Sequence, residues 1–253
     1  MFKKILCFVL SAALIMKISA LTLADGTDTI NGMIADQSIS KSVIDTLPES
    51  MKRELQQDDS ILISVSTTYF DLDTGKKTEK FMPESDFKLT VAISRLSSSQ
   101  MNKDGVYGDA FKFVATGQWL VNPFFEFTDC MGITWSDEFT LYDDYGYAYT
   151  KDYHGVPRFN YDALTLNAIA PEQGFSYDVD LLLFDRQDEI TIVGKVYKPE
   201  SLGNAKVCAS YGHVIIRPSS VGTSFSEGEE IGMDVGIFAG IKMALPAGGF
   251  FDY

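Results

Sequence analysis

From Ser60 onward, apolar residues recur at every second position in one short segment after another. Segments 61–66 (ILISVS) and 87–94 (FKLTVAIS) show this alternation most clearly. A period of two places alternate side chains on opposite faces of an extended strand, so each segment predicts a strand with one buried face. No long helical pattern interrupts the series. Consecutive strands without crossover helices favour antiparallel sheets.

Further strand candidates follow, separated by clusters of Gly, Pro, Asn and Asp. They are 111–121, 131–142, 145–150, 175–184, 189–197, 207–217 and 235–245. No internal repeat and no linker rich in Pro, Gly or Ser divides the chain. With 45% hydrophobic residues, residues 60–253 are sufficient for one sizeable core. The sequence therefore predicts a single all-β domain, an antiparallel β-sandwich-like or barrel-like fold.

Segment 25–59 is different, because its apolar residues follow a helical period. Ile39, Val43, Ile44 and Leu47 fall at helical spacing, and Pro48 is well suited to opening a second short helix. We expect a short N-terminal helical arm that packs on the β domain or leads into it.

Residues 1–24 have the pattern of a cleavable secretory signal. Two lysines precede the uncharged stretch 5–15, which is shorter than the ~20 apolar residues that span a bilayer. Small residues permit cleavage after Ala24, which we prefer, or after Ala20. Lys17 is unusual in such a signal and leaves an uncleaved amphipathic anchor as the alternative. We expect secretion without stable membrane insertion after cleavage.

The chain is acidic, with a formal net charge of −14, and loss of the signal removes three lysines but no acid. Such a surface repels phosphate backbones, so nucleic acid and anionic lipid are poor partners. The sign of the charge suits Ca²⁺, basic polymers or solubility alone. The candidate Ca²⁺ ligands are Asp71 and Asp73, Asp178 and Asp180, and the cluster 227–234. None provides the ligand pattern of an EF-hand, so we expect no cofactor and keep Ca²⁺ as the alternative.

Segment 119–149 contains both tryptophans of the chain. Its sequence, with W, NPFF, TD and GITWSDEFTLY in that order, resembles stretches of uncharacterised secreted proteins of Gram-positive bacteria. The resemblance implies a shared exported β fold and no known activity.

The same segment contains a row of tyrosines on one face of a strand, with two carboxylates just before it. The candidate ligand-binding residues are Trp135, Asp143, Asp144, Tyr145, Tyr147 and Tyr149. Aromatic faces beside acceptor oxygens bind sugars, whereas rows of tyrosines also serve as packing ladders between strands. The candidate partners are a cell-wall or host glycan, or another extracellular protein.

Cys130 and Cys208 are the only cysteines beyond the signal. In an oxidising compartment they form a disulfide if their geometry permits it. The alternative is two buried thiols that behave as small hydrophobic residues.

No sequence motif in the chain indicates an active site. His154 and His213 are the only histidines, the spacing of Cys208 and His213 matches no zinc motif, and no G-x-S-x-G sequence occurs. The preferred interpretation is a secreted binding module without catalysis. The alternatives are a hydrolase of glycan or peptide, built from residues distant in sequence, and a structural component of the cell envelope.

Overall fold

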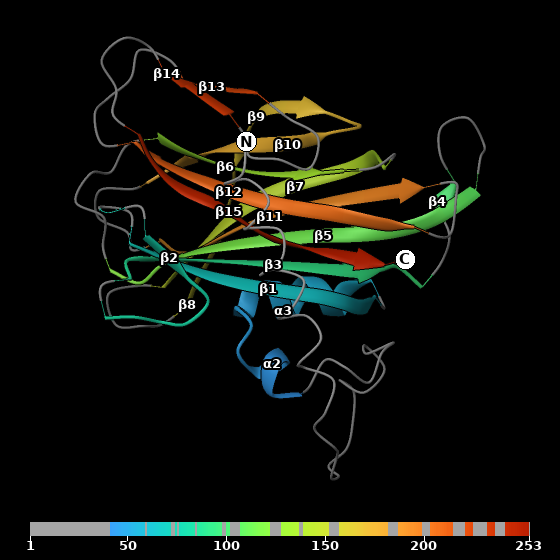
Figure 1. Ribbon diagram of the computed structural model, residues 1–253, viewed down its shortest axis with the longest axis horizontal. Helices are drawn as coiled ribbons and strands as arrows, with labels where there is room; N and C mark the ends of the chain where they lie inside the picture. The colour runs from blue at the N-terminus through green and yellow to red at the C-terminus, as the bar shows by residue number, and fades with distance from the viewer. Residues whose placement is uncertain are drawn as a thin grey trace, which may run out of the picture.

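The structure is a computed structural model of residues 1–253. It describes residues 41–58, 60–71, 74, 76–83, 85–97, 100–101, 107–121, 128–136, 139–151, 157–181, 187–198, 203–214, 221–224, 232–235 and 241–252. In these parts the chain forms two antiparallel sheets that pack face to face, with two short helices before them (Figure 1). The predicted all-β, sandwich-like fold with a helical arm is confirmed.

The larger sheet has the strand order β2-β1-β3-β5-β11-β7-β8, and β4 pairs with β5 outside this path. Its strands are β1 (Ile61–Asp71), β2 (Lys76–Thr78), β3 (Phe87–Arg95), β4 (Gln100–Met101), β5 (Tyr107–Trp119), β7 (Thr140–Lys151), β8 (Pro157–Ala163) and β11 (Gln187–Lys198). β1, β3 and β5 follow one another in chain order, but β11 lies between β5 and β7.

The second sheet has the order β15-β12-β6-β10-β9, and β13 pairs with β14 in a separate two-stranded sheet beside β9. Its strands are β6 (Thr128–Trp135), β9 (Thr165–Ala170), β10 (Gly174–Asp180), β12 (Asn204–Val214) and β15 (Ile241–Asp252), and the pair is β13 (Val221–Ser224) and β14 (Gly232–Val235).

The main core lies between the two sheets and is rich in aromatic rings. The rings of Phe87 and Tyr211 stack with centroids 4.2 Å apart, which links the larger sheet to the second sheet. Gly194 on β11 permits a close approach, because a Cβ atom there would lie 2.5 Å from Cε1 of Phe175. The sheets therefore pack tightly enough that a single added methyl group would disturb them.

The arm covers the outer face of the larger sheet. It consists of α2 (Lys41–Asp45) and α3 (Glu49–Gln57), which lie below β1 in Figure 1. The apolar residues of the arm and the sheet form a second cluster: Ile44, Leu47, Met51 and Leu55 pack with Leu62, Ala92, Val114 and Val193. Neither helix has the length or the apolar sequence needed to cross a bilayer, and the described part of the chain has no other helix.

Candidate functional site

A buried carboxylate joins the arm to the larger sheet. Glu54 on α3 is only 3% exposed, and its two oxygens accept hydrogen bonds from the hydroxyls of Tyr147 (2.8 Å) and Tyr145 (2.6 Å). The ammonium group of Lys112 donates to the Glu54 backbone carbonyl at 2.7 Å and lies 3.4 Å from its Oε2 atom. A buried charge is tolerated only with such partners, so this cluster fixes where α3 sits.

The C-terminal end of α3 is tied to the sheet by a chain of ion pairs. Oδ2 of Asp58 lies 2.5 Å from the Lys112 ammonium and 3.3 Å from that of Lys195, which lies 3.7 Å from Oδ2 of Asp143. Burial alone would raise the pKa of Asp58. Lys112, which hydrogen-bonds to it, and the charge of Lys195 nevertheless hold this pKa below its usual value.

The N-terminal end of α3 is held by a third polar group. The carboxylate of Glu189 accepts hydrogen bonds from the Ser50 backbone N–H and the Gln118 amide, both at 3.0 Å. The hydroxyl of Thr191 donates to that of Ser50 at 2.8 Å. Polar contacts with β5, β7 and β11 therefore extend along the whole length of α3.

The six candidate ligand-binding residues do not form one surface. Trp135 is fully buried between the sheets, where its Nε1 atom donates to the Phe139 carbonyl at 3.2 Å. Asp144 accepts a hydrogen bond from Tyr177 of the second sheet, whereas Tyr147 lies under the arm and is 9% exposed. The side chain of Tyr149 lies outside the described residues. The prediction of a single exposed aromatic face is therefore wrong for the described residues, because Trp135 on β6 is buried between the sheets, and alternation along β7 places Asp144 and Tyr147 on opposite faces of the larger sheet.

Part of the predicted surface is nevertheless exposed, beside the C-terminal end of α3. We call it the tyrosine rim, and it consists of Asp58, Tyr142, Asp143, Tyr145 and Lys195. Tyr142 is 37% exposed, and Tyr145 is half-buried. Burial first, and then the charges of Asp143 and Asp58, raise the pKa of Tyr142. Its hydroxyl is therefore a neutral hydrogen-bond donor at ordinary pH.

A bulge in β7 explains why the sequence missed Tyr142. Asp143 pairs with Lys195 and Leu141 with Val196, so Tyr142 is the extra residue between two paired positions. Strict alternation assigns Tyr142 to the same face as Asp144, whereas the bulge interrupts the alternation at this point. The pairing of lysines with Asp58 has no local sequence signal, since these residues are far apart in the chain.

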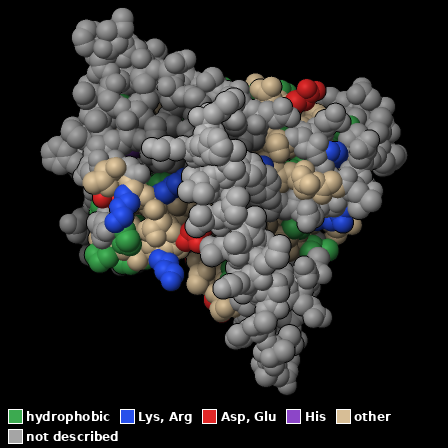
Figure 2. Space-filling view, viewed as in Figure 1, with side chains coloured by type: hydrophobic (Ala, Val, Ile, Leu, Met, Phe, Trp, Pro, Cys, Tyr) green, Lys and Arg blue, Asp and Glu red, His purple; other side chains and the backbone are tan. Residues whose placement is uncertain are grey.

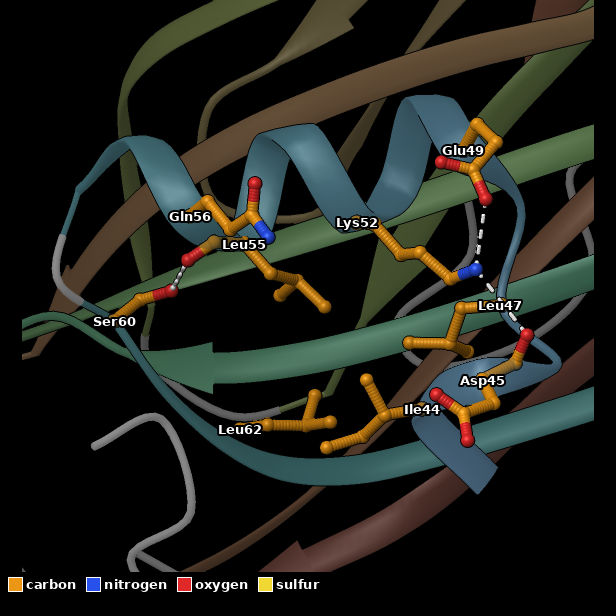
Figure 3. A pocket seen from close by; sticks show the side chains of 9 residues that line it. All are labelled: Ile44, Asp45, Leu47, Glu49, Lys52, Leu55, Gln56, Ser60 and Leu62. Carbon is orange, nitrogen blue, oxygen red and sulfur yellow. Dashed lines mark hydrogen bonds and ion pairs between the residues drawn. The ribbon is translucent and has the colours of Figure 1, made fainter. Parts of the chain in front are cut away.

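The structure also contains a pocket of about 170 Å³ between α2, α3 and β1 (Figure 3). Its lining residues are Ile44, Asp45, Leu47, Glu49, Lys52, Leu55, Gln56, Ser60 and Leu62. The ammonium of Lys52 donates to Oε1 of Glu49 at 2.8 Å and to the Asp45 carbonyl at 3.2 Å, as Figure 3 shows. Asp45, Glu49 and Gln56 are exposed, so the pocket reaches the surface.

The second histidine belongs to a buried cluster at the end of the core. Nδ1 of His213 lies 3.0 Å from a carboxylate oxygen of Asp129, which also accepts hydrogen bonds from Tyr211 and from the Val214 backbone N–H at 2.9 Å. Asp129 is 0% and His213 is 4% exposed. Burial is the largest influence on Asp129 and raises its pKa. These groups satisfy one another inside the fold and do not face solvent, and His154 lies outside the described residues.

Cys130 and Cys208 are both buried and form no disulfide in the structure, which is the second of the two alternatives drawn from the sequence. In the pairing of β6 with β12, Cys130 lies opposite Gly212 and Cys208 opposite Thr134. The two thiols are therefore offset by four residues, or about 13 Å along the strands, which exceeds the reach of a disulfide. Burial, as the main cause, raises the pKa of Cys130 to about 12.

Among the described residues, no group of three or more His, Cys, Asp or Glu side chains is arranged to hold a metal ion. Asp71 instead accepts hydrogen bonds from the backbone N–H and hydroxyl of Thr74, as in a turn. Asp178 accepts from the Asn167 amide at 2.6 Å, and Asp180 from the Thr128 hydroxyl at 2.5 Å. Asp73 and residues 227–231 of the cluster 227–234 lie outside the described residues.

A separate exposed group surrounds β2. Phe81 is 60% exposed and packs edge-on against Tyr69, with ring centroids 5.9 Å apart. Figure 2 shows apolar and basic side chains close together at the left of the molecule, where β2 lies in Figure 1. Glu79 and Asp71 lie among the lysines of this hairpin in the sequence, so its charges are mixed.

No protein-family model matches the chain, and no curated protein matches it either. Two solved structures resemble it weakly. One is the KRT10-binding region domain of the pneumococcal serine rich repeat protein PsrP, with 11% identity, a TM-score of 0.34 and coverage of 60% of this chain and 87% of that one. The other, described as a pore forming protein, has 6% identity, a TM-score of 0.31 and coverage of 73% and 90%. This similarity is too low to transfer a ligand or an activity.

Proposed function

We propose that the protein is exported and works outside the cell as a binding module that holds a ligand without changing it chemically. The signal-like residues 1–24 and the strongly acidic composition support this assignment. The ligand-contacting surface in this proposal is the tyrosine rim, and the ligand class is a cell-wall or host glycan.

One observation carries the proposal: the Tyr142 ring is exposed directly beside the exposed carboxylate of Asp143. A ring face packs against the apolar face of a sugar, while carboxylates accept hydrogen bonds from its hydroxyls. Lys195 links Asp143 to Asp58 and so restricts the motion of both acids. A surface fixed in this way loses little conformational entropy when a ligand binds.

The test is retention of the protein lacking residues 1–24 on purified cell-wall glycan and on a panel of host glycans. We expect Tyr142→Ala to lower the affinity for the retaining glycan about tenfold, which corresponds to ~1.4 kcal/mol. Phe81→Ala is the matched control, because it removes an exposed ring beside β2, at the opposite edge of the sheet from β7. Equal retention of the wild type and Tyr142→Ala, or no retention on any glycan, contradicts the proposal.

Two further measurements accompany this test. Repeating the retention assay with a chelator shows whether Ca²⁺ takes part in binding. For export, N-terminal sequencing of the protein from the culture medium is expected to begin at Asp25, whereas recovery only in membranes with Met1 intact would contradict secretion.

A further inference from the structure

The pocket between α2, α3 and β1 is separate from the tyrosine rim and contains different chemistry. The rim combines exposed rings with carboxylates, whereas four apolar side chains line the pocket. These are Ile44, Leu47, Leu55 and Leu62, which point toward one another around the space in Figure 3. We propose that this pocket binds a small ligand that carries a benzene-sized apolar group next to a positive charge.

The volume determines the size of the apolar group. Apolar cavities of about 150 Å³ accept benzene, and this pocket has about 170 Å³. A single aromatic ring or a branched aliphatic group therefore matches the size of this space. Leu47 and Leu55 belong to the buried apolar cluster under the arm and also line the pocket, so an apolar group there would extend that cluster.

The charges at the mouth determine the sign of the ligand. Asp45 and Glu49 are exposed acids, and Lys52 is the single base among the lining residues. The ammonium of Lys52 is already bound to Glu49 and to the Asp45 carbonyl, so it is poorly available to an anion. The mouth thus has an excess of one negative charge on a protein of net charge −14. A cation next to the apolar group is therefore attracted by the acids at the mouth and by the negative charge of the whole protein.

Three probes of similar shape test the proposal: phenethylammonium, the neutral phenylethanol and the anion phenylacetate. Binding to the protein lacking residues 1–24 is measured by chemical-shift titration at low salt. We expect phenethylammonium to bind about tenfold more tightly than phenylacetate, with phenylethanol between them. Glu49→Gln is expected to lower the affinity for phenethylammonium about fivefold. Glu172→Gln, an exposed substitution in the turn between β9 and β10 with the same change in total charge, is expected to leave it unchanged.

A steric variant locates the site. Ile44→Phe places a larger side chain in the pocket and is expected to abolish binding, whereas Val43→Phe changes an exposed neighbour on α2 that does not line the pocket. Circular dichroism and the unfolding midpoint confirm that both variants are folded. The proposal is overturned if no probe binds at millimolar concentrations, if the anion binds as well as the cation, or if Ile44→Phe leaves binding unchanged.

Discussion

Oε1 of Glu54 accepts a hydrogen bond from the Tyr147 hydroxyl at 2.8 Å, although 93 residues separate the two in the sequence. The ring of Tyr145 lies nearly parallel to that of Tyr147, with centroids 6.5 Å apart, and its hydroxyl reaches the other oxygen of the same carboxylate. Most of the predicted tyrosine face is therefore occupied by the protein's own arm.

Removing the Tyr147 hydroxyl is expected to destabilise the protein. Tyr147→Phe takes one donor from a buried carboxylate, and a hydrogen bond to a charged group is worth about 2 kcal/mol. Urea unfolding measures this loss. Tyr145→Phe serves as the control, because Tyr145 is half-buried and water can replace its hydroxyl, so its effect is expected to be smaller. A Tyr147→Phe protein as stable as the wild type would contradict the role given to Glu54.

Lys112 is fully buried between Glu54 and Asp58, so its removal leaves two acids with too few partners. We expect Lys112→Met to lower the free energy of unfolding by about 3 kcal/mol. Lys195→Met, at a position that is 19% exposed, is expected to cost much less. If Lys112→Met were the more stable of the two variants, the ion cluster would not be what holds α3 in place.

Acid is expected to loosen the arm through Asp58. The pKa of Asp58 is lowered in the folded protein, so between the folded and unfolded pKa values the unfolded chain binds the extra proton. The contribution of Asp58 to the free energy of unfolding is complete above the ordinary pKa of about 4. It is lost as pH falls through the lower pKa of the folded protein.

The pH test compares the wild type with Asp58→Asn. Asp129 and Asp178 have raised pKa values and act in the opposite direction, so only the difference between the two proteins isolates Asp58. The stability advantage of the wild type is expected to shrink as pH falls below about 4. A constant difference would show that Asp58 is not coupled to the lysines.

The thiols of Cys130 and Cys208 are expected to be unreactive in the native protein and free once it unfolds. Both are buried, and the pKa of Cys130 is raised to about 12, so thiolate is scarce at neutral pH. Alkylation of the protein lacking residues 1–24, without reductant, is expected to label no cysteine before denaturation and two after it. Mass spectrometry that finds neither labelled after denaturation would instead indicate a disulfide.

Gly194→Ala is expected to destabilise the core by about 2 kcal/mol, because the added Cβ would lie 2.5 Å from the ring of Phe175. Gly146→Ala is the comparison, since the closest contacts of a Cβ atom there are longer, at 3.1 Å to the side chains of Ile192 and Leu164. Thermal unfolding of both variants measures the difference. Equal effects would mean that the sheets can separate slightly at Gly194 without cost.

Alternation along the chain was sufficient to predict the sheets, because it depends only on local sequence. It does not reveal which of the two sets of side chains faces the second sheet. On the larger sheet both sets are covered, one by the second sheet and the other by the arm. Asp144 and Tyr145 therefore have different surroundings although they are adjacent in the sequence, and the tyrosine row could not be classified from its pattern.

Other differences have specific physical causes. The predicted strand 131–142 ends at Trp135, and β7 begins at Thr140 in the other sheet, so an apparently continuous segment crosses between sheets. Strand β9 was not predicted, because it lies at a sheet edge where Leu166 and Ile169 are 44% and 47% exposed. The signal and the resemblance to secreted proteins of Gram-positive bacteria stay predictions.

The position of β11 between β5 and β7 constrains the order in which the strands can assemble during folding. β1, β3 and β5 are neighbours in sequence and can associate early, but the sheet cannot join β5 to β7 until β11 has been made and inserted. The Ser50 backbone N–H donates to Glu189 of β11 across 139 residues. The arm therefore comes before the sheet in the chain but can complete its docking only after β11 has joined the sheet. Contacts of such long range slow folding, and insertion of β11 is the expected rate-limiting step.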